Sequence, residues 1–158
     1  MNYFEPHLTP DELRAISAIG LAHMGDAVYE TLVRTWLCVH GKATGKELHR
    51  ATIALVCAQK QAELAQRVLP QLTEEELAVY KRGRNANVHA MPRSATPAQY
   101  HAATGLECLM GWLYLQGDKE RAEQLFRAMM EEEEHAAGCR MPAGCGGGAG
   151  APDHRQPY

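Results

Sequence analysis

Residues 20–39, "GLAHMGDAVYETLVRTWLCV", form a long and mostly apolar run in this sequence. Its apolar residues recur at spacings of three and four, which is the period of an α-helix. Asp26 lies in the middle of this run, where a helix packed into a core normally carries apolar side chains. The stretch therefore predicts one long helix, and Asp26 needs a separate explanation.

The starts of four helices share one chemical device, the pattern T-x-x-E/Q. In this pattern the threonine hydroxyl caps a free backbone N–H while the acidic or amide side chain reaches back. The four threonines are Thr9, Thr44, Thr73 and Thr96, and two of them are followed by proline, which favours the first helical position. Apolar residues at helical spacing predict helices over about 10–18, 20–39, 45–69 with a break near Cys57, 74–86, 97–116 and 118–134. We expect Gly41 and Gly117 to end the second and fifth of these helices, and a loop from Met91 to Ser94. No period-two pattern persists, so the predicted fold class is all-α.

The composition indicates one globular domain outside membranes. The chain has 158 residues, of which 46% are hydrophobic and 22% charged, and these are ordinary values for a single folded domain. No apolar run reaches the length of a membrane span, and the start "MNYFE" lacks the features of a signal peptide. We expect a cytoplasmic protein without a membrane partner.

Two further features of the chain concern cysteines and the C-terminal end. The five cysteines include no C-x-x-C pair, which favours reduced thiols over a disulfide framework or a zinc site. From Ala136 onward the sequence is rich in Gly, Ala and Pro and has no periodicity. We predict a folded domain over 1–135 and a flexible tail over 136–158.

Two isolated carboxylates lie in the two most apolar helices. Asp26 occupies the first, and Glu107 occupies "TGLECLMGWLYL", residues 104–115. An unpaired carboxylate inside a protein must protonate, find a cation or bind a metal. Small residues beside them, Gly25 and Gly105, could admit another helix or a phosphate. Structural pairing of Asp26 with Arg34, pairing of Glu107 with a Lys or His, and simple exposure to solvent all stay open at this point.

The neighbouring acid Glu30 has a simpler explanation. It lies four residues before Arg34, and residues at this spacing share one face of a helix. We expect an ion pair between Glu30 and Arg34.

A third feature is the basic stretch "YKRGRNANVH", residues 80–89. Guanidinium and ammonium groups bind phosphate oxygens and release counterions from a polyanion. The net charge of −3 hides this local cluster. Cations that only complement a helix C-terminus would be the simpler explanation for one or two of these residues. Carboxylates able to hold a divalent metal, next to such a cluster, indicate metal-assisted phosphodiester chemistry. The candidate phosphate-binding residues are Lys81, Arg82, Arg84 and Asn85.

At this point the sequence resembles a known family. "LAHMGDAVYE", residues 21–30, is similar to the signature helix of ribonuclease III, and "TGLECLMGWLYL" is similar to its second acidic helix. The intervening "KRGRNA", residues 81–86, points to the compact mini-ribonuclease III subfamily. So does a chain that ends where a double-stranded-RNA-binding domain would begin. The resemblance spans about residues 13 to 130.

The resemblance implies an all-α, ribonuclease III-like endonuclease domain that forms a symmetric homodimer. It implies that Asp26 and Glu107 are the catalytic carboxylates and hold Mg²⁺, with Mn²⁺ as a substitute. Lys81, Arg82, Arg84 and Asn85 would contact the RNA backbone. Ala22 and Thr104 stand where full-length ribonuclease III enzymes carry two more acids, so this chain departs from the four-acid pattern as the subfamily does.

The implied activity is hydrolysis of double-stranded RNA by an endoribonuclease. The expected substrate is the precursor of large-subunit (23S) ribosomal RNA, and the expected role is rRNA processing in ribosome biogenesis, with a ribosomal protein as a candidate helper. One alternative is a non-catalytic, ribonuclease III-like RNA-binding protein. Another is a helical interaction module in which Asp26 and Glu107 only form ion pairs.

Overall fold

The computed structural model describes residues 2–40, 44–87 and 94–138, and within them the fold is entirely helical. The loop expected around Met91 to Ser94 and the end of the long helix at Gly41 fall largely outside these residues. The helices are α1 (Pro10–Ala15), α2 (Ala18–Val39), α3 (Gly45–Val56), α4 (Ala58–Val68), the short 3-10 helix η1 (Leu69–Gln71), α5 (Glu74–Arg84), α6 (Pro97–Gln116) and α7 (Lys119–Gly138).

All four T-x-x-E/Q stretches begin helices, as predicted. At Thr9, Thr73 and Thr96 both halves of the capping box are present. At Thr44 the hydroxyl accepts the backbone N–H of Glu47 at 3.3 Å and donates to the carboxylate of Glu47 at 2.8 Å. The local sequence therefore fixes where these four helices start.

The helix ends also agree with expectation in most places. Cys57 has an extended backbone and separates α3 from α4, which confirms the predicted break. Gly117 ends α6 with a φ of 92°, a conformation that glycine adopts without strain. α1 stops at Ala15, three residues earlier than predicted, because Ile16 is extended.

The last helix is longer than predicted. α7 continues to Gly138, past the expected domain boundary at residue 135, since Ala136 and Ala137 favour helix once the preceding turns have formed. Residues 139–158 lie outside the described part of the chain, so the tail stays a prediction there.

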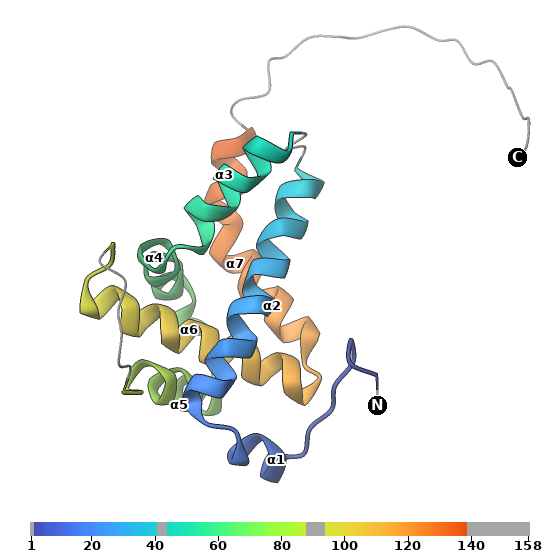
Figure 1. Cartoon of the computed structure of the whole chain (residues 1–158), viewed down its shortest axis with the longest axis vertical. Coiled ribbons are helices and arrows are strands. Elements are labelled where there is room, and N and C mark those ends of the chain that lie inside the picture. Colours follow the sequence, from blue (N-terminus) through green and yellow to red (C-terminus); the bar gives the residue numbers. More distant parts are fainter. Residues whose placement is uncertain (1, 41–43, 88–93, 139–158) are drawn as a thin grey trace, which may run out of the picture.

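α6 is the central element of the fold. α2 crosses it on one side, and α4 and α5 pack along it, as Figure 1 shows. Its buried side chains include Leu106, Leu109, Met110 and Leu113, and they pack against residues of α2, α4 and α7. Each helix that carries a candidate site residue therefore contacts α6 or is α6 itself.

Two close helix crossings fix the positions of α2 and α5 on α6. A Cβ atom added to Gly25 in α2 would lie 1.6 Å from the carbonyl oxygen of Glu107, and one added to Gly111 would lie 2.0 Å from that of Leu21. A Cβ atom on Gly83 in α5 would lie 2.8 Å from the carbonyl oxygen of Thr104. Only glycine lets the helix backbones approach this closely.

The helices lack the character of membrane spans. Across the ranges given above, no helix combines the length and the apolar run that crossing a bilayer needs.

Candidate functional site

The crossing of α2 and α6 brings the two predicted carboxylates together. Gly25 meets the backbone of Glu107, and Asp26 follows Gly25 directly in α2. Asp26 is exposed to solvent and Glu107 is half-buried. The carboxylate of Asp26 acts electrostatically on that of Glu107. Two acids that are 81 positions apart in the chain therefore share one electrostatic environment.

The electrostatics of this pair are unfavourable for two negative charges. Burial and the nearby charge of Asp26 raise the pKa of Glu107 from 4.5 to about 7. Partial burial, together with the charge of Glu30, raises the pKa of Asp26, and His23 opposes that shift. Ionising both carboxylates is therefore unfavourable in the absence of a cation, and a nearby cation would favour their ionised forms.

No Lys, Arg or His side chain forms an ion pair with either acid among the residues that the structure describes. Arg34 pairs with Glu30 instead, its Nε donating to Glu30 Oε1 at 2.7 Å, as expected. Neither Asp26 nor Glu107 has an ion pair with any Lys, Arg or His in the described ranges. Structural pairing, which the sequence left open for both acids, is thus absent from this part of the molecule.

The protein atoms at the pair suit a hard divalent cation that keeps most of its water. Within the described chain, no group of three or more His, Cys, Asp or Glu side chains could hold a metal. Ala22 is buried and apolar, and the Thr104 hydroxyl donates to the carbonyl of Tyr100 at 3.0 Å. Two carboxylates remain, and Mg²⁺ is commonly bound by one or two carboxylates plus waters.

The basic residues are at the C-terminal end of α5. Lys81, Arg82, Arg84 and Asn85 are all exposed. Gly83, between them, packs on Thr104 and Cys108, which flank Glu107 in α6. The helix crossing thus places this basic helix end beside the segment of α6 that carries Glu107.

These four side chains differ in the hydrogen bonds and ion pairs that they form within the protein. Arg82 donates to the carbonyl of Ile16 at 2.6 Å, so it also ties α5 to the end of α1. Arg84 Nε lies 3.4 Å from Asn85 Oδ1. Lys81 forms no ion pair with any described residue. Lys81 and Arg84 are the freer phosphate-binding candidates.

Gly105 has a different role from the one that its sequence position suggested. It packs against Tyr80 of α5, where an added Cβ would lie 2.8 Å from the ring. A helix, and not a phosphate, occupies the space beside it. Gly25 likewise admits a helix.

Gln61 is not among the site residues predicted from the sequence. It lies in the first turn of α4, is 1% exposed, and its amide lowers the pKa of Glu107. The available signal was a single amide on a helix face that otherwise carries small or apolar residues, namely Ala62, Leu64 and Ala65.

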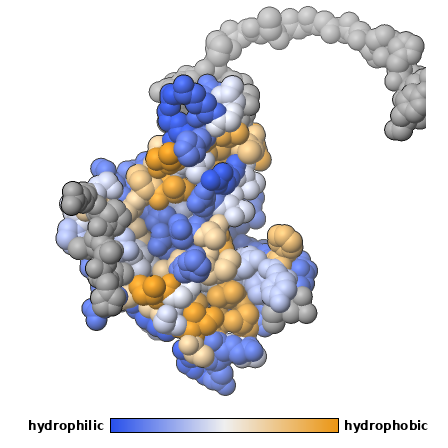
Figure 2. Space-filling model, viewed as in Figure 1, coloured by the Kyte–Doolittle hydropathy of each residue, from blue (hydrophilic) through white to orange (hydrophobic). Residues whose placement is uncertain are grey.

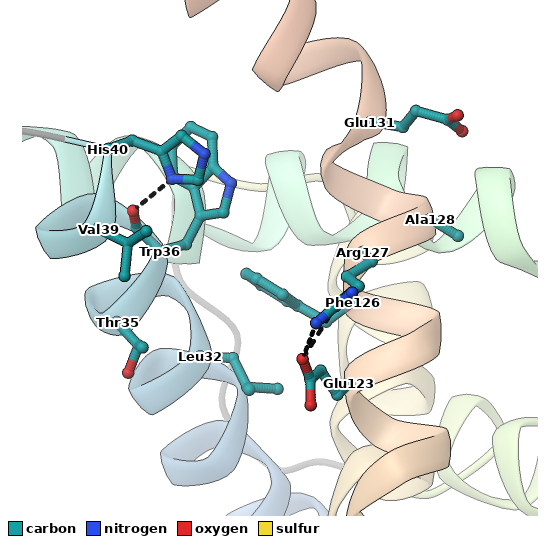
Figure 3. A pocket seen from close by; sticks show the side chains of 10 residues that line it. All are labelled: Leu32, Thr35, Trp36, Val39, His40, Glu123, Phe126, Arg127, Ala128 and Glu131. Carbon is teal, nitrogen blue, oxygen red and sulfur yellow. Dashed lines mark hydrogen bonds and ion pairs between the residues drawn. The ribbon is translucent and has the colours of Figure 1, made fainter.

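A surface depression with a volume of about 690 Å³ lies between α2 and α7. Figure 3 shows Leu32 and Phe126 facing its interior and the ion pair of Glu123 with Arg127 at its edge. Asp26, Glu107 and the basic residues of α5 do not line it. The depression is therefore separate from the carboxylate pair.

Comparison with known proteins gives the family. A ribonuclease III domain model matches residues 20–118. The Mini-ribonuclease 3 of Symbiobacterium thermophilum is 45% identical over 108 residues, 68% of this chain and 83% of the relative. That of Enterococcus faecalis is 42% identical over 116 residues, 72% and 88% of the two chains. A crystal structure of a Fusobacterium nucleatum protein covers 78% of this chain and 96% of its own, with 30% identity and a TM-score of 0.71.

The family match contains both carboxylates and the basic end of α5. It also contains the two helix crossings that bring them to α6. The chain belongs to the ribonuclease III family, in its mini-ribonuclease III branch, and is an endoribonuclease.

Proposed function

We propose that this protein cleaves double-stranded RNA in a reaction that needs a divalent metal, Mg²⁺ by preference, held by Asp26 and Glu107. The observation that carries the proposal is the carboxylate pair at the α2–α6 crossing. Burial and the charge of Asp26 raise the pKa of Glu107, and neither acid forms an ion pair with a Lys, Arg or His of the described residues. A divalent cation supplies the missing positive charge at this point.

The chemistry follows from what this pair can hold. A bound Mg²⁺ supplies a Lewis acid that lowers the pKa of a coordinated water and stabilises charge on a phosphoryl group. The exposed carboxylate of Asp26 and the half-buried carboxylate of Glu107 would hold the ion. With only two carboxylates, the affinity for the ion is modest, and a millimolar requirement is expected.

The basic end of α5 gives the RNA a second contact beside the pair. Duplex RNA is recognised mainly through its shape, phosphates and 2′-hydroxyls. Lys81 and Arg84 provide exposed cations, and Arg82 and Asn85 extend the same helix end. We propose that these four side chains bind the phosphates that flank the scissile bond.

We also propose that the active enzyme is a homodimer. Along α2, Ile19, His23, Ala27 and Thr31 are exposed at four-residue spacing, and none of them is acidic, Lys or Arg. Ala27 and Thr31 continue into an apolar groove of about 320 Å³ with Met24 and Val28. Figure 2 shows hydrophobic residues gathered beside the N-terminal half of α2. Exposed apolar surfaces of this kind commonly mark protein interfaces.

A symmetric pair of such subunits would offer two carboxylate sites to the two strands of a duplex. We propose the precursor of 23S ribosomal RNA as the substrate and the cytoplasm as the location. A ribosomal protein is the proposed helper. The support is membership of the mini-ribonuclease III branch.

The test is cleavage of a duplex RNA, labelled at the 5′ end of each strand in turn. The wild-type protein with Mg²⁺ is expected to make staggered cuts. Asp26→Asn and Glu107→Gln should each lower the cleavage rate by more than about 100-fold. Changes to residues that only support the metal ligands typically cost roughly 10- to 100-fold. Both should keep duplex binding and far-UV circular dichroism.

The matched control is Glu120→Gln, which removes one exposed acid from α7 and should cut as the wild type does. Full cleavage by Asp26→Asn and Glu107→Gln would exclude the pair as metal ligands. Binding without cleavage in Mg²⁺ and Mn²⁺ alike would favour the non-catalytic alternative.

A further inference from the structure

Gln61 is a buried polar side chain without a hydrogen-bonding role in the fold. It is 1% exposed, and neither its amide nitrogen nor its amide oxygen has a hydrogen-bond partner among the described residues. A buried polar group left unpaired costs about 1–3 kcal/mol. Such groups are rare in native proteins, and each one calls for an explanation.

The break at Cys57 decides where this amide lies. The chain turns there, and α4 starts with the backbone N–H of Gln61 donating to the Cys57 carbonyl at 3.0 Å. After this turn, α4 packs along α6. Gln61, in the first turn of α4, then faces α6 from the buried side of the helix.

The amide acts on Glu107. It lowers the pKa of that carboxyl, opposing the larger effects of burial and of the charge of Asp26. No hydrogen bond of normal geometry joins the two side chains in this structure. α2 meets Glu107 through Gly25, and α4 meets it through Gln61. Glu107 is thus held between an acid on one helix and an amide on another.

We propose that Gln61 is a positioning residue for the metal site, whose amide N–H donates to one oxygen of ionised Glu107 and leaves the other oxygen for the divalent cation. The inference rests on the proposed function, because it takes Glu107 as a metal ligand. An amide suits this task since it donates a hydrogen bond without adding charge. Partners of this kind orient carboxylate ligands and tune metal affinity.

The experiment measures Mn²⁺ binding to the purified protein by the loss of the electron paramagnetic resonance signal of free Mn²⁺. Gln61→Met keeps the volume and removes the donor, and should weaken Mn²⁺ binding about 10-fold. In duplex cleavage, the Mg²⁺ concentration for half-maximal rate should rise about as much, with a smaller change in the rate at saturating Mg²⁺. Gln61→Leu is the second variant, and Gln59→Met, at an exposed position in the same turn, is the matched control.

The melting temperature separates this role from a structural one. Since Gln61 leaves its amide unpaired, Gln61→Met should melt at or above the wild-type temperature in the absence of metal. A lowered melting temperature with unchanged Mn²⁺ affinity in both variants would overturn the proposal and make Gln61 structural.

Glu107→Gln distinguishes this inference from the proposed function. If the wild type binds no Mn²⁺, or Glu107→Gln binds it equally well, the metal site itself is wrong. If Glu107→Gln loses binding while Gln61→Met and Gln61→Leu match the wild type, only the role of Gln61 is wrong.

Discussion

At the scale of single residues, the decisive pair is Asp26 and Glu107. An acid in an apolar helix had three explanations from the sequence: an ion pair, exposure to solvent, or a ligand site. The structure gives different surroundings for the two acids and an ion pair for neither within the described residues. Asp26 is exposed and Glu107 is half-buried, and no cation in the described residues pairs with either. Glu30, by contrast, takes the expected partner Arg34.

Glu107 predicts how the stability of the metal-free protein depends on pH. The folded state raises the pKa of this carboxyl from 4.5 to about 7, so between these values it binds more protons than the unfolded chain. The free energy of unfolding should therefore fall as pH rises from about 4.5 to 7 and level off above, by up to about 3 kcal/mol. The raised pKa of Asp26 acts in the same direction.

Urea unfolding in EDTA at a series of pH values measures this effect. Glu107→Gln should flatten the fall and be more stable than the wild type above pH 7, while the control Glu120→Gln should keep it. A wild-type stability that rises across the same interval would contradict the assignment.

At the scale of elements, glycine contacts decide which helices meet. An alanine at residue 25 would place its Cβ 1.6 Å from the backbone oxygen of Glu107, and only separation of α2 from α6 relieves this overlap. Gly25→Ala should cost about 3 kcal/mol or more of unfolding free energy. The protein that stays folded should also cleave RNA more slowly, because Asp26 moves away from Glu107.

Gly45→Ala is the control for this prediction. A Cβ atom at residue 45 meets no atom of the described residues within 4 Å, so this variant should be unchanged or up to about 1 kcal/mol more stable. Tryptophan fluorescence during urea unfolding measures both variants. Equal stabilities for the two alanine variants would mean that the α2–α6 crossing is wider than described.

The basic end of α5 gives a second prediction at this scale. Lys81→Ala and Arg84→Ala should weaken duplex RNA binding and each lower the slope of log affinity against log salt by about 1. Arg82→Ala should do the same and also destabilise the fold by about 1 kcal/mol, since Arg82 donates to the Ile16 carbonyl.

Titration of labelled RNA at several salt concentrations measures these effects. Arg127→Ala, which removes an exposed cation of α7, is the control and should bind as the wild type does. Unchanged binding in both Lys81→Ala and Arg84→Ala would remove the helix end from the RNA interface.

At the scale of the whole molecule, the uncharged face of α2 predicts association of two copies. Sedimentation equilibrium should give twice the 17.4 kDa chain mass. Thr31→Arg adds a charge to this face and should shift the protein to monomer and reduce cleavage, with its helix content unchanged. Gln66→Arg, at an exposed position of α4, should leave the dimer intact, and a dimeric Thr31→Arg would place the interface elsewhere.

Most helices of this protein, and the residue types at its candidate site, could be predicted from the sequence. The T-x-x-E/Q starts, Gly117 and the break at Cys57 act through neighbouring backbone groups, so local sequence was enough to predict them. The end of α7 was less predictable, because helix termini depend on cooperative extension from the preceding turns.

Which side chains meet depends on the packing of the helices and could not be predicted from the sequence. Asp26 and Glu107 come together because Gly25 and Gly111 let two backbones touch, and the basic end of α5 reaches the same part of α6 through Gly83. Gln61 joins them only because α4 turns at Cys57 and packs on α6. Contacts between distant segments depend on how helices pack, and the spacing of residues along one helix carries no direct record of that packing.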